Sequence, residues 1–80
     1  MTLQELAVYK TADEEKRREI ESYIAEIPDP QTREMFRLHF IGGYSYSQTA
    51  RKVGGGMSRH CVFYRVTRYV KRRLKKLSTV

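Results

Sequence analysis

Apolar residues recur at spacings of three and four along most of this chain, which is the periodicity of amphipathic helices. Ile20, Tyr23, Ile24 and Ile27 form one such stripe. No window alternates apolar and polar residues for long enough to predict a strand. The pattern therefore predicts an all-α fold, a small helical domain.

Capping residues and helix breakers divide the pattern into four main helices. Proline and glycine separate them, because proline lacks a backbone donor and glycine readily adopts the conformations that end a helix. A weaker pattern around Leu3 and Leu6 predicts one further short turn. The expected main helices are Ala12 to about Ile27 after a Thr11 cap, Pro30 to the Gly42-Gly43 pair after Asp29, Tyr46 to about Val53 after Ser45, and Arg59 to about Leu77 after Ser58.

The second of these helices is predicted to be the centre of the core. Its apolar residues, which cover more than half of its circumference, are Met35, Phe36, Leu38, Phe40 and Ile41. His39 lies within this stretch and is expected to be a packed residue rather than a ligand. The expected core contacts of the last helix are Val62, Val66, Tyr69, Val70, Leu74 and Leu77.

Length and composition exclude several classes of protein. Eighty residues predict a single domain (1–80), with an acidic helical segment at 1–27 followed by the unit at 28–77. A lone Cys61 with only His39 and His60 makes neither a disulfide nor a zinc set, so no metal or other cofactor is expected. No nucleophile and base, or paired carboxylates around a pocket, stand out, so no enzyme is expected. Without an apolar run or signal-peptide pattern, a cytoplasmic protein that does not contact membrane is expected.

Charge is distributed very unevenly along the chain. Residues 1–40 hold six basic and nine acidic side chains, whereas residues 41–80 hold ten basic and no acidic ones. Such a basic block repels itself unless a polyanion neutralises it. The asymmetry predicts a nucleic-acid partner, and double-stranded DNA in particular once the motif below is considered.

The basic half carries the pattern of a helix-turn-helix. A short helix with Ala50 near its middle is followed by Gly54, and a second helix starts after Ser58 with Val62 turned inward. The small side chain of Ala50 allows the two helices to cross closely, and Gly54 is expected to end the first helix in a left-handed conformation. The sequence therefore predicts a C-terminal helix-turn-helix.

Residues 27–77 resemble region 4 of bacterial sigma factors and the small sigma-region-4-like proteins of prophages and mobile elements. The resemblance is carried by Ile27, Arg33, Phe36, Phe40, Gly43 and Ser45, by Gln48-Thr49-Ala50, and by Val62, Arg68 and Tyr69. Two features depart from the family pattern: residues 55–57 lengthen the turn, and Thr49 replaces a larger aliphatic residue. The resemblance implies a sequence-specific transcriptional regulator whose last helix enters the major groove.

The resemblance also assigns roles to individual residues. The family's base-reading positions fall on Arg59, His60, Phe63 and Tyr64, and their chemistry fits guanine, a base edge and a thymine methyl group. The expected phosphate contacts are Tyr46, Ser47, Arg51, Lys52, Ser58, Arg65, Arg68, Lys71 and Arg72.

Other interpretations of the same residues stay open at this point. The chain is too short for a complete sigma factor, so RNA polymerase, a second sigma-like subunit or a second copy of the chain is an expected partner. One alternative is a protein-interaction module that docks on RNA polymerase or on a phage assembly. A third is the DNA-binding subunit of a packaging or recombination complex.

Overall fold

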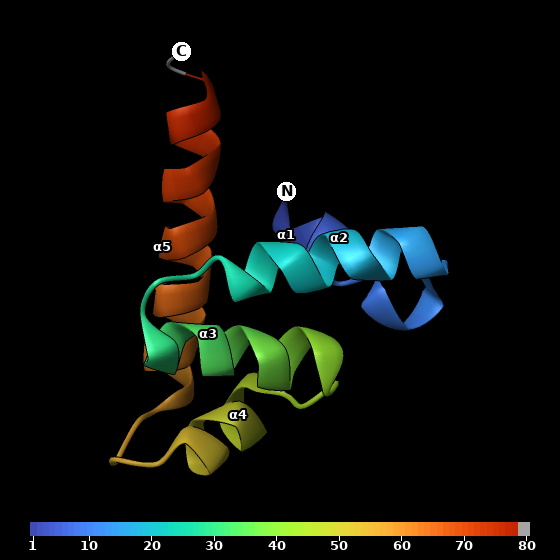
Figure 1. Cartoon of the computed structure of the whole chain (residues 1–80). Helices are drawn as coiled ribbons and strands as arrows, with labels where there is room; N and C mark the ends of the chain where they lie inside the picture. Colours follow the sequence, from blue (N-terminus) through green and yellow to red (C-terminus); the bar gives the residue numbers. More distant parts are fainter. Residues whose placement is uncertain (79–80) are drawn as a thin grey trace.

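Helices account for the architecture of residues 1–78, which are the residues that the structure, a computed structural model, describes (Figure 1). No strand is present in that range, which confirms the all-α prediction. In chain order the elements are α1 (Leu3–Leu6), the 3-10 turn η1 (Tyr9–Thr11), α2 (Glu14–Ala25), α3 (Pro30–Phe36), the π-helical segment η2 (Arg37–Ile41), α4 (Tyr46–Val53) and α5 (Arg59–Ser78).

The helix α2 starts later than the sequence predicted. Asp13, not Thr11, is its cap, and the Asp13 carboxylate accepts a hydrogen bond from the Lys16 amide at 2.8 Å. Residues 9–11 fold back instead as η1, because the Arg17 guanidinium donates to the carbonyls of Tyr9 (3.0 Å) and Lys10 (2.9 Å). The helix also ends at Ala25, two residues before the predicted end at Ile27.

The predicted continuous helix from Pro30 changes type halfway along. Asp29 caps α3 and Pro30 takes its first position, as expected. From Arg37 the backbone widens into η2, where the Gly42 amide donates to the Arg37 carbonyl, five residues earlier, at 2.9 Å. Such π-helical turns are rare and occur frequently at functional sites.

The α4–α5 connection follows the predicted helix-turn-helix order. Ser45 caps α4 in a reciprocal capping box with Gln48, and α4 spans the predicted residues. Gly54 ends it with φ +79° and ψ −161°. The positive φ was expected, but the ψ is extended rather than left-handed helical, in a region that is essentially reserved for glycine. Gly55 and Gly56 also have positive φ.

The core lies where α2, α3 and η2 meet α4 and the first three turns of α5 (Figure 1). The buried side chains include Ile20, Ile24, Met35, Phe36, Ala50, Val62, Val66 and Val70. The C-terminal turns of α5 project beyond the other helices, so Leu74 is 36% exposed, contrary to the predicted core contact. The Leu77 side chain, also predicted to be a core contact, lies outside the described residues. Within the described residues, no helix is both long and apolar enough to cross a membrane.

Candidate nucleic-acid interface

The helix α5 separates its apolar and cationic residues onto opposite sides. Val62, Val66 and Val70 are fully or almost fully buried. At about 100° per residue, His60, Tyr64, Arg68, Lys71 and Lys75 fall on the opposite side, and all five are exposed. The buried valines thus fix which side of α5 is available to a partner.

The four predicted base-reading residues lie together on the first two turns of α5. Arg59 and His60 are exposed, and Phe63 and Tyr64 are 51% and 59% exposed. Ser58 caps these turns, because its hydroxyl accepts a hydrogen bond from the Cys61 amide at 3.3 Å. The structure therefore presents an arginine, a histidine and two aromatic rings near the start of one helix.

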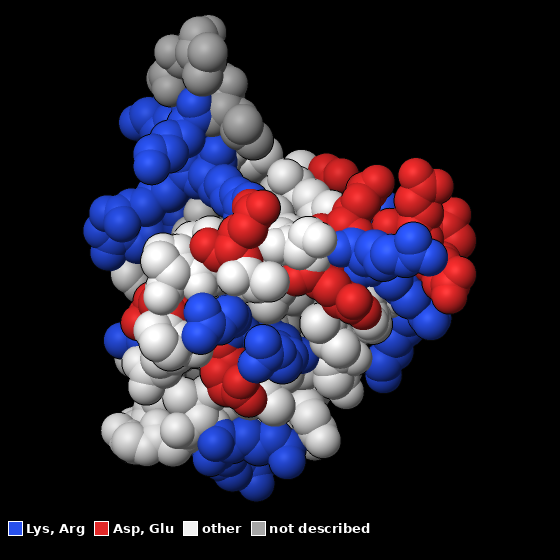
Figure 2. Space-filling view, in the orientation of Figure 1, with Lys and Arg blue, Asp and Glu red and all other residues white. Residues whose placement is uncertain are grey.

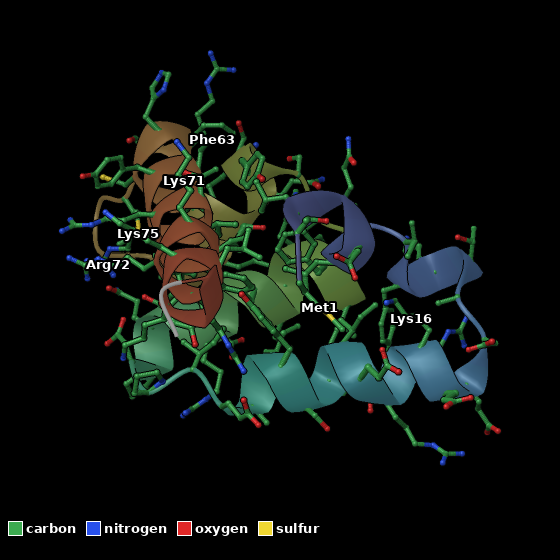
Figure 3. The ribbon with its side chains drawn as sticks, turned by 90° about the horizontal axis from the view of Figure 1, so that it is seen from above. Met1, Lys16, Phe63, Lys71, Arg72 and Lys75 are labelled. Carbon is green, nitrogen blue, oxygen red and sulfur yellow. The ribbon has the colours of Figure 1, made fainter. Side chains whose placement is uncertain are left out.

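Further along α5, a shallow groove runs between cationic side chains. Its lining residues are Tyr64, Thr67, Arg68, Lys71, Arg72 and Lys75. The Arg68 guanidinium donates to the Tyr64 hydroxyl at 3.4 Å and lies 5.7 Å from the centroid of its ring. Figure 3 shows Lys71, Arg72 and Lys75 on the side of α5 that is turned away from Met1 and α2. Lys75 and Thr67 were missed as site residues, although both lie four residues from Lys71 on one helical face.

The helix α4 adds two more exposed cations, Arg51 and Lys52. The Lys52 ammonium lies 4.5 Å from the centroid of the Tyr44 ring, which gives this lysine a preferred position. Ser47 is half-buried, and so is the side chain of Tyr46.

Two arginines of α5 are held by the rest of the protein instead. Arg65, a predicted phosphate contact, donates to the Gln31 side chain and lies 3.9 Å from the Asp29 carboxylate. Arg73 is ion-paired with Glu26, donates to the Tyr23 carbonyl at 3.2 Å, and stacks 4.0 Å from the centroid of the Tyr23 ring. Both arginines anchor α5 to acidic side chains at the end of α2 and the start of α3.

Basic and acidic side chains are distributed unevenly over the surface (Figure 2). Lysine and arginine side chains cover the projecting half of α5, while aspartate and glutamate gather around α2. No Asp or Glu follows Glu34 in the sequence, so none belongs to α4 or α5. A polyanion that approaches α5 from its exposed side meets no carboxylate of that helix.

An aromatic cluster that sequence reasoning missed adjoins the predicted base-reading residues. The His39 ring, from η2, stacks on the Tyr46 ring at 4.0 Å between centroids and 15° between planes. Tyr46 in turn meets Phe63 edge to face at 5.3 Å. Burial lowers the pKa of His39, and its Nδ1 donates to the Tyr44 carbonyl at 2.8 Å. The spacing of His39, Tyr46 and Phe63 in the sequence gives no signal for this contact.

In the described part of the chain, no three His, Cys, Asp or Glu side chains gather closely enough to hold a metal ion. Comparisons with protein-family models, curated proteins and solved structures gave no match to this chain.

Proposed function

We propose that this protein is a sequence-specific, double-stranded DNA-binding regulator of transcription, similar to sigma-factor region 4, in which the start of α5 enters the major groove. The observation that carries the proposal is the exposed surface of α5: Arg59, His60, Phe63 and Tyr64 lie on its first two turns, Arg68, Lys71 and Arg72 follow, and the helix has no acidic residue. A cytoplasmic location and RNA polymerase as a partner belong to the same proposal.

The chemistry of the two halves of α5 differs in a way that suits DNA. Arginine can offer a bidentate pair of donors to guanine, and aromatic rings can contact a thymine methyl group, so the first two turns suit base edges. The lysines and arginines that follow suit phosphate oxygens, which carry no sequence information. Lys71 lies roughly 18 Å along the helix axis from Arg59. Because the major groove is only about 12 Å wide, Lys71 and the residues after it reach the rim of the groove.

The proposal predicts different consequences for two single substitutions. Arg59→Ala should relax base preference at one position of the bound site, with a loss of about 1–3 kcal/mol for the preferred sequence. Lys71→Ala should weaken binding to all sequences about equally and reduce the salt slope of the affinity by about one. Selection from a random duplex pool, followed by titrations at several salt concentrations, measures both effects.

Arg18 on α2 is a suitable control, since its side chain is 74% exposed and pairs only loosely with Glu14 at 3.6 Å. Arg18→Ala should change neither the base preference nor the salt slope of the affinity. If wild-type protein shows no affinity for any duplex at low salt yet still captures RNA polymerase, the interaction-module alternative replaces the proposal.

A further inference from the structure

The three contacting rings of His39, Tyr46 and Phe63 come from three different elements and extend to the proposed DNA surface. His39 belongs to η2, Tyr46 is the first residue of α4, and Phe63 lies on the second turn of α5. Only Phe63 of the three is exposed, whereas His39 and Tyr46 are half-buried. The cluster therefore connects the interior of the domain with one proposed base-reading side chain.

Contacts with the interior of the domain fix the orientation of the His39 ring. The hydrogen bond from Nδ1 to the Tyr44 carbonyl fixes the orientation of the imidazole, and the Phe40 ring meets it edge to face at 4.8 Å. The flat stack with Tyr46 then restricts the tyrosine ring, whose first-turn position in α4 is fixed by the Ser45–Gln48 capping box. Each ring thus has a partner that limits its rotation.

An exposed phenylalanine without such contacts would exchange between rotamers and lose entropy on binding. The edge-to-face contact with Tyr46 reduces that loss, since it favours one orientation of Phe63 before DNA arrives. A preoriented ring discriminates better between bases than a mobile one, because a displaced contact forfeits much of its dispersion energy.

We infer that His39 and Tyr46 are positioning residues that hold Phe63 for contact with a thymine methyl group. Base preference at one step of the site then depends on two side chains that do not themselves reach a base. This inference rests on the proposed function and adds to it the base that Phe63 recognises and the residues that make the recognition possible.

The sharpest measurement replaces thymine by deoxyuridine at each position of the selected site, because this change removes only the methyl group. For wild-type protein, this replacement should lower the affinity about fourfold at one position of the site. That factor corresponds to the free energy of burying about one methyl group. Phe63→Leu and Tyr46→Leu should each abolish most of that loss, and the double variant should do no more than either alone.

Two further variants separate positioning from general stability. Tyr46→Phe keeps the ring and should retain the sensitivity to deoxyuridine. Tyr44→Ala removes a neighbouring ring that contacts Lys52 but keeps the backbone carbonyl that accepts the hydrogen bond from His39, so this variant should also retain the sensitivity to deoxyuridine. Circular dichroism and thermal melting establish that each variant is folded, and His39→Leu provides a second test if Tyr46→Leu does not fold.

The outcomes distinguish this inference from the function on which it rests. If wild-type protein binds its site with clear base preference, but Tyr46→Leu and His39→Leu leave the deoxyuridine effect unchanged, the positioning role is wrong and the proposed function stands. The positioning role is also overturned if these two variants bind all sequences more weakly by the same factor while the deoxyuridine effect stays intact. Absence of any duplex binding by the wild type would instead reject the proposed function, and the inference with it.

Discussion

His39 shows how one side chain in this small core combines packing with ionisation. Its imidazole is half-buried, with Tyr46 on its face and the Tyr44 carbonyl on Nδ1. Desolvation disfavours the charged ring, so the folded-state pKa lies below the ordinary value of 6.5. The unfolded chain consequently takes up a proton at a higher pH than the folded protein does.

This difference predicts how stability depends on pH. As pH falls through 6.5, the unfolded state binds the proton first, so the free energy of unfolding decreases until the folded-state pKa is passed. The contribution of His39 is therefore fully present above pH 6.5 and is lost on acidification. Urea denaturation at closely spaced pH values between about 5 and 7.5 measures this dependence.

His39→Phe should flatten the pH dependence in this range, because it keeps a ring against Tyr46 and removes the titrating group. The exposed His60 provides the matched control, and His60→Gln should leave the dependence in place. Glu5 and Asp29, whose pKa values are lowered from 4.5 and 3.8 mainly by hydrogen bonds from Thr2 and Thr32, titrate below this range. A His39→Phe variant with wild-type pH dependence would contradict the role given to burial.

At the scale of elements, the orientation of α5 depends on the contact between Arg73 and the end of α2. The guanidinium combines the Glu26 ion pair, a bond to the Tyr23 carbonyl and a ring contact, and its side chain is 27% exposed. Arg73→Met should lower the free energy of unfolding by about 1–2 kcal/mol, since a charge-assisted hydrogen bond and a cation–π contact are lost together. The neighbouring, exposed Arg72→Met should change it by less than about 0.5 kcal/mol in chemical denaturation. Equal effects of the two substitutions would show that the Arg73 contacts do not anchor α5.

Helix boundaries set by a local signal were predicted well, and features set by contacts across the fold were not. The Ser45 cap and Gly54 together define α4, and both act within one turn of the chain. Thr11 and Asp13 are both competent caps, and the choice between them is made by Arg17, which ties η1 back onto α2. The π-helical geometry of η2 has no sequence signal of this kind.

The same distinction applies to the candidate site. The exposure of His60, Tyr64 and Arg68 follows from the positions of the buried valines on α5, which the helical period predicts. Arg59 is exposed although the period places it on the side of the valines. The pairing of Arg65 with Gln31 and Asp29 joins residues more than thirty positions apart, so periodicity could not predict it. Leu74 repeats the core spacing, but α5 extends beyond the helices that would cover it.

For the whole molecule, the separation of charge determines the affinity for a duplex that the proposed function predicts. Six exposed cations on α4 and α5 belong to the proposed phosphate-contacting surface: Arg51, Lys52, Arg68, Lys71, Arg72 and Lys75. Arg65 is left out of this count because its guanidinium is already engaged by Gln31 and Asp29. Apart from Glu26, which pairs with Arg73, the acidic side chains of α2 lie away from the projecting half of α5, so most of this surface is accessible to phosphates (Figure 2).

Each phosphate neutralised in B-DNA contributes about −0.9 to the slope of log affinity against log salt, so six contacts predict a slope of about −5. Affinity for a single site should accordingly fall about 10³-fold between 50 and 200 mM salt, which leaves binding by one copy weak under physiological conditions. Fluorescence anisotropy with a short duplex over this range measures the slope. Arg65→Ala should change it by much less than Lys71→Ala, because Arg65 would first have to leave its internal partners. A wild-type slope near −2 would mean that only one end of α5 meets the backbone.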